Sequence, residues 1–244
     1  MRIGVFDSGL GGLTVLKNLY KHYPNNEYIY YGDTLNLPYG SKSKEELIGL
    51  ASNDIEFLLT KQVDIIIIAC GTVSSNCLEY LKNRYDIPIY DIITPTINYL
   101  NNSNYSNVGI IATERTIDSD IFKKKLIKNV YQIKTPKLVP MIENNNLSDI
   151  DNILDTYLSK YKNKIDILVL GCTHYPIIKK HINKYFNNKI DLLDMSDPIL
   201  PLLKEDNTSN ITIYFSKNSS ITIKQTKNIL ELDNLNILEK TEYK

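Results

Sequence analysis

Short apolar runs alternate with segments of helical periodicity along almost the whole of this 244-residue chain, and this alternation limits the fold more than any other feature. The runs that we expect to form strands are 3–6, 28–31, 64–69, 87–92, 108–112, 137–142, 165–170, 190–193 and 211–215. Strands that alternate with helices are typical of parallel sheets covered by helices. The predicted fold class is therefore α/β, with mainly parallel sheets flanked by helices.

The clearest helical segment is 41–62. Ser43 and Glu46 have the spacing of a capping box near its start. Its apolar residues fall on one face, and they are Leu47, Leu50, Ala51, Ile55 and Leu58. We therefore expect a helix that begins close to Ser43.

Two pairs of segments resemble each other at nearly the same separation along the chain. The first pair is RIGVFDSGLGGLTVL and NVGIIATERTIDSDI, in which Gly4 matches Gly109, 105 residues later. The second pair is DIIIIACGTVSSN and DILVLGCTHYPII, in which Cys70 matches Cys172, 102 residues later. An internal repeat of this kind indicates two similar α/β domains, each with a cysteine after its third or fourth strand.

Composition argues against several classes of function. The 28 basic and 28 acidic residues give a formal net charge of +0, without the basic surplus that is typical of nucleic-acid binders. No apolar run reaches the roughly 18 residues of a membrane span, and the N-terminus lacks the apolar segment of a signal peptide. We therefore expect a cytoplasmic protein that acts on a small molecule, with neither nucleic acid nor a membrane as partner.

The three cysteines, Cys70, Cys77 and Cys172, form no CxxC pair, so neither a disulfide framework nor a zinc ribbon is indicated. The histidines have no metal-ligand spacing with them. We therefore expect reduced thiols and no metal. Cys77 follows Cys70 on a similar face of one predicted helix and has no polar motif of its own, so we assign it to packing.

Cys70 and Cys172 each follow a buried strand and precede a predicted helix, which after Cys172 should begin near Pro176. A helix N-terminus favours negative charge and lowers the pKa of a thiol below about 8.5. The carboxyl ends of strands are also where open α/β sheets bind ligands. Two thiols on opposite sides of one carbon can remove a proton from one face and donate a proton to the other, which inverts a stereocentre.

The segment FDSGLGG follows the first predicted strand. That strand ends at Asp7, Ser8 supplies a hydroxyl, and Gly9, Gly11 and Gly12 let the backbone approach a ligand. The spacing does not match GxGxxG, and the carboxylate of Asp7 would repel a phosphate. The segment therefore favours a turn beside a small molecule over a phosphate site.

Five motifs occur in the order and at the spacings found in one enzyme family. They are GVFDSGLGGLTVL, YYGDTLNLPYG, IIIIACGTVSSN, VPMIE and LGCTHYPII. Over essentially its whole length the chain resembles the glutamate racemases of the cofactor-independent aspartate/glutamate racemase family. The resemblance implies an isomerase without a cofactor that converts L-glutamate to D-glutamate for peptidoglycan synthesis.

The resemblance also implies two α/β domains with the active site in the cleft between them. The first would comprise residues 1–92 and 205–244 and carry Asp7 and Cys70. The second would comprise residues 93–204 and carry Glu143 and Cys172. The resemblance further implies a homodimer.

Roles for individual residues follow from the same resemblance. Cys70 would act on the D-enantiomer with help from Asp7. Cys172 would act on the L-enantiomer with help from Glu143 and His174. The residues implied in holding the substrate are Asp7, Ser8, Tyr39, Gly40, Gly71, Thr72, Thr116, Thr173 and His174.

One position departs from the family pattern. The family usually has Cys-Asn-Thr at its first catalytic cysteine, whereas this chain has Gly71 between Cys70 and Thr72. Loss of the amide removes a donor and an acceptor, which would cost about 1 to 3 kcal/mol if that group binds substrate. The alternatives are therefore a racemase of aspartate or of a broader range of amino acids, an amino-acid-binding protein with weakened catalysis, and a one-cysteine relative such as a decarboxylase.

Overall fold

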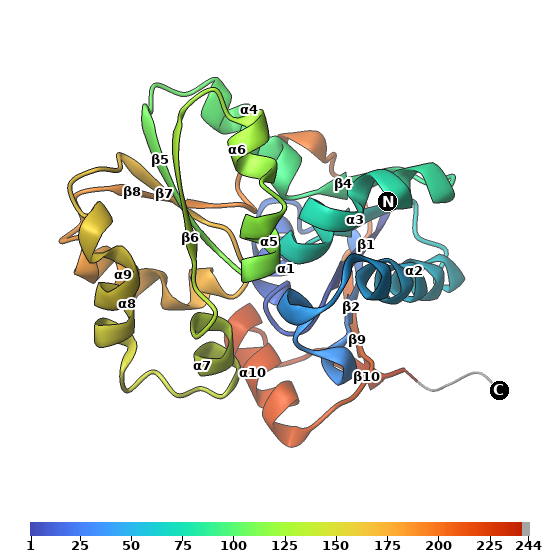
Figure 1. The fold of residues 1–244 in the computed structure, drawn as a ribbon. Helices are drawn as coiled ribbons and strands as arrows, with labels where there is room; N and C mark the ends of the chain where they lie inside the picture. Colours follow the sequence, from blue (N-terminus) through green and yellow to red (C-terminus); the bar gives the residue numbers. More distant parts are fainter. Residues whose placement is uncertain (241–244) are drawn as a thin grey trace.

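The computed structural model describes residues 1–240, which form two parallel sheets (Figure 1). The first sheet has the strand order β10-β9-β2-β1-β3-β4 and the second has the order β6-β5-β7-β8. The strands of the first sheet are β1 (Arg2–Asp7), β2 (Glu27–Gly32), β3 (Ile65–Ile68), β4 (Ile89–Asp91), β9 (Asn210–Phe215) and β10 (Asn236–Glu239). Those of the second are β5 (Asn107–Ala112), β6 (Asn129–Lys134), β7 (Ile167–Leu170) and β8 (Asp191–Asp194).

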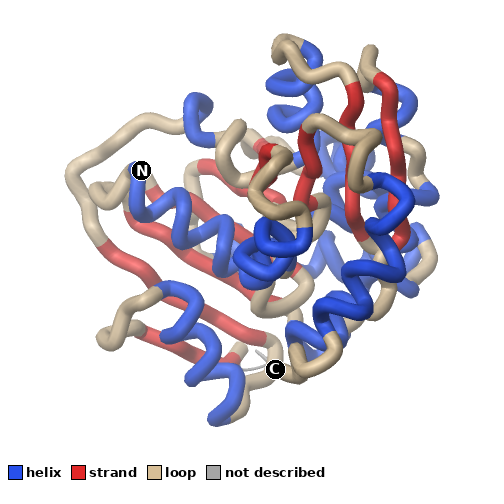
Figure 2. Tube along the Cα trace, turned by 90° about the vertical axis from the view of Figure 1, so that its left-hand side faces the viewer, coloured by secondary structure: helices blue, strands red, loops and turns tan. Residues whose placement is uncertain are grey.

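Helices lie against the strands of both sheets (Figure 2). The α-helices are α1 (Leu13–His22), α2 (Lys44–Thr60), α3 (Gly71–Arg84), α4 (Ile93–Asn101), α5 (Glu114–Asp118), α6 (Ile121–Lys125), α7 (Leu138–Glu143), α8 (Ile150–Leu158), α9 (Lys179–Tyr185) and α10 (Ser220–Leu230). Short 3₁₀ helices are η1 (Thr34–Asn36), η2 (Tyr39–Ser41), η3 (Ser159–Tyr161), η4 (Tyr175–Ile178) and η5 (Leu200–Leu202). None of the helices within residues 1–240 combines the length and the apolar character needed to cross a bilayer.

The predicted fold class is confirmed, because the two sheets share one topology. The order β2-β1-β3-β4 of the first sheet recurs as β6-β5-β7-β8 in the second. The matched glycines of the sequence lie on β1 and β5, and the matched cysteines follow β3 and β7. Strands β9 and β10 extend only the first sheet. The exact division of the chain into domains stays a prediction.

The predicted helix near Ser43 is confirmed as α2. The Ser43 side chain accepts a hydrogen bond from the Glu46 backbone, and the Glu46 side chain accepts one from the Ser43 backbone, so the capping box is complete. Most of the predicted apolar face is buried, while Leu50 is half-buried. The helix therefore begins at Lys44 because its first free backbone donors are satisfied by side chains.

The strand predicted at 137–142 is wrong, because these residues form α7. Leu138 and Ile142 are four residues apart and both buried, which is the spacing of one helix face. Pro140 has no N–H to pair in a sheet, but in the first turn of a helix that donor would be unpaired anyway. The edge strand that pairs with β5 is β6, and no strand was predicted there from the sequence.

One apolar cluster joins the two sheets. It contains Ile3, Val5 and Ile67 from the first sheet together with Val108 and Ile110 from the second. Two further clusters cover the outer faces of the individual sheets. The shared cluster therefore places the carboxyl edges of both sheets around one space.

Candidate active site

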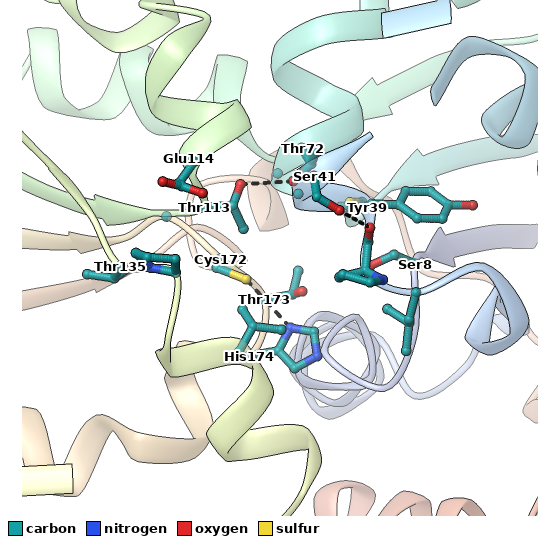
Figure 3. A pocket seen from close by; sticks show the side chains of 18 of the residues that line it. Ser8, Tyr39, Ser41, Thr72, Thr113, Glu114, Thr135, Cys172, Thr173 and His174 are labelled. Atoms are coloured by element: carbon teal, nitrogen blue, oxygen red, sulfur yellow. Dashed lines mark hydrogen bonds between the residues drawn. The ribbon is translucent and has the colours of Figure 1, made fainter. Parts of the chain in front are cut away.

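A cavity of about 230 Å³ lies where the carboxyl ends of the two sheets meet (Figure 3). Residues that the sequence analysis assigned to the site and that line this cavity are Asp7, Ser8, Tyr39, Gly40, Cys70, Gly71, Thr72, Cys172, Thr173 and His174. The cavity also has walls that the sequence analysis did not identify, which are Leu37, Pro38, Ser41, Thr113, Glu114, Thr135, Pro136, Val139, Pro140 and Gly171. Glu143 and Thr116 do not line it.

The two matched thiols reach the cavity from different sheets. Cys70 follows β3 and is the residue that precedes α3, while Cys172 follows β7 by two residues. Their exposed fractions are 4% and 7%. Both sulfur-bearing side chains are therefore nearly buried yet border the same space.

The pKa of Cys70 differs from the sequence prediction. Burial and the nearby Asp7 carboxylate raise the pKa of the Cys70 thiol well above its usual value, although backbone N–H groups of Thr72 and Val73 act in the opposite direction. A helix N-terminus alone would lower this pKa. Desolvation outweighs the helix here, which favours the protonated thiol at Cys70.

Cys172, His174 and Glu143 form a line of contacts that ends in the cavity. The Cys172 sulfur lies 3.5 Å from His174 Nδ1, and His174 Nε2 contacts Glu143 Oε1 at the end of α7. Burial lowers the pKa of His174, but its hydrogen bonds to Cys172 and Glu143 outweigh that effect and raise this pKa well above its usual value. Glu143 therefore acts on the cavity only through His174.

The chain after Cys172 also differs from the prediction. Tyr175–Ile178 is the 3₁₀ helix η4, with Pro176 in its first turn, and the α-helix α9 begins only at Lys179. Pro176 thus starts a helical turn as expected, but not an α-helix. The Cys172 sulfur therefore has the His174 ring as its hydrogen-bonding neighbour, while the next α-helix N-terminus lies seven residues further along the chain.

Asp7 lies at the base of the cavity. Its Oδ2 atom accepts hydrogen bonds from the backbone N–H of Gly12 at 2.7 Å and from the Thr173 hydroxyl at 3.3 Å. Its Oδ1 atom is buried and has no hydrogen-bond partner among residues 1–240. One carboxylate oxygen is therefore fixed by both halves of the site, and the other is free to accept a proton or a hydrogen bond.

Gly11 is required by close approach of the two halves. A Cβ atom at this position would lie 2.5 Å from His174 Nδ1 and even nearer to Thr173 Oγ1. The glycines of FDSGLGG therefore let the first sheet's loop approach the second sheet's site residues, and not only a ligand as the sequence suggested.

We expect Gly11→Ala to lower any activity of this cavity by at least about 10-fold, because the added methyl group displaces His174 from Cys172 and small misplacements of groups that act on a ligand are costly. Gly49→Ala is the matched control. Gly49 is exposed in α2, and a Cβ atom there meets nothing within 4 Å. It should gain about 0.5 to 1 kcal/mol of stability with unchanged activity, as measured by thermal melts and rate assays. Wild-type activity in Gly11→Ala would contradict this account.

The side chains of Tyr39 and Thr116 do not reach the cavity, although both residues were expected to contact a ligand. The ring of Tyr39 points away from the cavity, so its backbone forms the wall (Figure 3). The Thr116 hydroxyl is buried 3.0 Å from the Thr113 hydroxyl, which in turn lies 3.1 Å from that of Thr72. Thr113 thus stands between Thr116 and the cavity. The resemblance implied Thr116 as a contact, whereas Thr113 is the threonine that lines the cavity.

The sequence of this chain is similar to those of known amino-acid racemases. The profile of the Asp/Glu/Hydantoin racemase family matches residues 21–197. A glutamate racemase of Aquifex pyrophilus is 37% identical over 226 residues, which are 88% of this chain and 89% of that protein. One of Hydrogenobaculum is 39% identical over 91% of this chain and 90% of its own length. The chain belongs to the Asp/Glu/Hydantoin racemase family.

Solved structures extend the comparison to the fold. A glutamate racemase of Francisella tularensis in complex with D-glutamate superimposes with a TM-score of 0.87 at 32% identity, covering 98% of this chain and 97% of that one. An aspartate racemase of Picrophilus torridus has a TM-score of 0.61 at 20% identity over 80% of this chain and 89% of its own, which shows a shared fold alone. The protein is thus an isomerase of the amino-acid racemase class.

In this racemase, several acid-base groups border the cavity. Within the described part of the chain, no group of three or more His, Cys, Asp or Glu side chains is placed to hold a metal ion. The titratable groups at the cavity include two thiols, each beside a second ionisable side chain, Asp7 for Cys70 and His174 for Cys172, and Glu114 also lines the cavity. Groups of this kind can move protons to and from a carbon atom.

Proposed function

We propose that this racemase interconverts L-glutamate and D-glutamate with Cys70 and Cys172 as its two acid-base groups. The observation that supports this most strongly is that the two thiols come from separate sheets and border one cavity. Inversion needs two acid-base groups on opposite sides of the substrate, because the proton must leave one face of the α-carbon and return to the other.

The two thiols would begin the reaction in different states. In the L-to-D direction, Cys172 acts as a thiolate beside the charged imidazole of His174 and removes the α-proton. Cys70 then donates its proton to the opposite face, and its raised pKa keeps it in the thiol form that this step requires. In the D-to-L direction the roles reverse: Asp7, whose Oδ1 has no hydrogen-bond partner within residues 1–240, takes the proton of Cys70, and His174 gives Cys172 the proton that Cys172 then donates to the α-carbon.

Substrate binding would use hydroxyl and backbone groups of the cavity wall. Ser8, Thr72 and Thr173 supply hydroxyls, and Gly40 and Gly71 supply backbone. Asp7 and His174 supply charge next to them. Glutamate is the proposed substrate because the relatives with high coverage are named glutamate racemases and one related structure holds D-glutamate.

The direct test is to incubate the purified protein with L- and D-glutamate and with L- and D-aspartate, without pyridoxal phosphate, and to separate enantiomers by chiral chromatography. We expect both glutamate enantiomers to approach an equal mixture. Conversion of aspartate alone would favour the alternative substrate. No conversion of any of the four, together with binding of glutamate, would favour the binding-protein alternative.

Gly71 provides a test of substrate choice. A Cβ atom at this position would lie 3.0 Å from the carbonyl oxygen of Gly171, so a side chain needs a shift of a few tenths of an ångström. We expect Gly71→Ala to lower kcat/KM for glutamate several-fold through this contact. Gly71→Asn carries the same Cβ plus the amide, and we expect a 5- to 100-fold higher kcat/KM than in Gly71→Ala, which corresponds to about 1 to 3 kcal/mol. Equal values for the two variants would show that the amide has no role here.

We further propose that the reaction takes place in the cytoplasm, that it supplies D-glutamate for peptidoglycan, and that the protein is a homodimer. Rescue of a bacterial strain that needs added D-glutamate would test the first two points together. Light scattering of the purified protein would test the third.

A further inference from the structure

The side chain of Tyr39 is held by two buried carboxyl groups that the proposed chemistry does not use. Its hydroxyl lies 2.7 Å from Oδ2 of Asp33 and 3.2 Å from Oδ2 of Asp54. Asp33 follows β2, Asp54 lies in the middle of α2, and each is 2% exposed. Two carboxyl groups that contact one phenol cannot both accept its single proton at full strength, so the protonation of each carboxyl group matters.

The hydrogen bonds of this group fix its protons. The Asn36 amide donates to both oxygens of Asp33, at 3.0 and 2.9 Å, so Asp33 acts as the acceptor. A phenol has one proton, and its shorter contact is to Asp33. A protonated Asp54 can then donate to the phenol oxygen across the longer contact of 3.2 Å. Burial and the neighbouring Asp33 raise the pKa of Asp54 well above its usual value, which agrees with a neutral acid.

The other side of the same loop forms a wall of the cavity. Tyr39–Ser41 line it, and a Cβ atom on Gly40 would lie 3.2 Å from the Thr113 side chain across the space between the sheets. Next along the chain, Arg115 Nε donates to the carbonyl oxygen of Lys42 at 2.8 Å. The wall is therefore held on one side by the Asp33, Tyr39 and Asp54 group and on the other by the segment around α5.

We propose that Asp54 is a positioning residue for substrate binding, which fixes the Tyr39–Ser41 wall through the phenol of Tyr39 and the carboxylate of Asp33. The proposal rests on the proposed function, because it takes this wall as part of the glutamate site. A wall that binds the substrate and the transition state alike affects KM more than kcat. Loss of the network should therefore weaken binding and leave proton transfer largely intact.

Three variants test the network. We expect Asp54→Ala and Tyr39→Phe to raise KM for both glutamate enantiomers about 10-fold, with kcat within about 3-fold of wild type. Asp54→Asn keeps a neutral donor of the same shape, so its KM should stay within about 3-fold. The matched control is Tyr85→Phe, which removes a phenol that also contacts α2, through Ser52 O and Glu56, but away from the cavity. Its KM should be unchanged.

The outcomes separate this inference from the proposed function. An unchanged KM in Asp54→Ala, or an equal rise in Asp54→Asn and Asp54→Ala, would overturn the positioning role. If Asp54→Ala does not fold, the KM of Tyr39→Phe tests the positioning role instead, because this variant retains the buried ring. If the wild type does not racemise glutamate, the function fails, and the dissociation constant for D-glutamate from calorimetry replaces KM. A 10-fold weaker binding in Tyr39→Phe would still support the inference, and no difference or no binding would contradict it.

Stability against pH tests the proton on Asp54 separately. The ionisable groups that interact with Asp54 are Asp33, Tyr39, Tyr30, Tyr31, Asp7 and Lys240. Folded Asp54 retains a proton that the unfolded chain loses near pH 4, so the contribution of Asp54 to wild-type stability falls as pH rises above about 4. Asp54→Asn lacks this effect. Its melting temperature relative to wild type should therefore rise from pH 5 to pH 8, and a constant difference would contradict a neutral Asp54.

Discussion

Cys70→Ala and Cys172→Ala are each expected to lower the rate of glutamate racemisation by about 10³-fold in both directions. Inversion needs a base on one face of the α-carbon and an acid on the other, and a positioned acid or base contributes about 10² to 10⁴-fold. Because the two enantiomers are equally stable, kcat/KM must fall equally from either side. Chiral chromatography with each pure enantiomer measures both rates.

Cys77→Ala is the matched control for these two variants. Cys77 is 1% exposed in α3, packs in an apolar cluster with residues such as Val73 and Leu81, and does not line the cavity. Its loss should reduce stability slightly and leave racemisation within about 3-fold. Near-wild-type racemisation in either Cys70→Ala or Cys172→Ala would contradict the two-thiol account and favour a one-cysteine relative.

His174→Asn is expected to lower kcat by about 10²-fold at neutral pH. The raised pKa of His174 means that its ring carries a charge at neutral pH, and in the proposed mechanism this charge stabilises a thiolate at Cys172, 3.5 Å away. A thiolate forms less readily without a cation beside it, so the variant needs a more alkaline solution to reach the same rate. The activity of the variant should therefore increase from pH 7 to pH 9, whereas wild-type activity should not require this rise.

Glu143→Gln should have a smaller effect in the same direction, about 10-fold, because the amide still accepts a hydrogen bond from His174 but carries no charge. His181→Asn is the control, since His181 lies half-exposed on α9 and does not line the cavity. Its rate and pH profile should match wild type. A flat pH profile in His174→Asn with a full rate would show that Cys172 does not need the imidazole.

The sequence predicted the strands well where both faces are covered, and at the sheet edges it predicted β4 and β8 but missed β6 and β10. β3 reads as four isoleucines because helices bury both of its faces. β6 and β10 are edge strands with exposed residues among the apolar ones, so they show no continuous run. The apolar run at α7 was then assigned as a strand in place of β6, because a short run does not distinguish a strand from a buried helix.

The candidate site was predictable where its residues lie directly after a strand. Cys172, Thr173 and His174 are consecutive and follow β7, so a strand prediction alone locates them. Asp54 lies 15 residues from Tyr39, and only the packing of α2 brings the two side chains together. The raised pKa of Cys70 was also out of reach, because it depends on how closely the second sheet covers the first.

The central claim is that two thiols act on opposite faces of one carbon, and the most direct measurement is early hydrogen exchange in heavy water. L-Glutamate is incubated with the wild-type protein, and both enantiomers are isolated at low conversion for mass spectrometry. We predict deuterium at the α-carbon of the newly formed D-glutamate and protium in the remaining L-glutamate, because separate groups remove and deliver the proton. Deuterium at equal levels in both enantiomers from the start would mean that one group serves both faces, and would contradict the account.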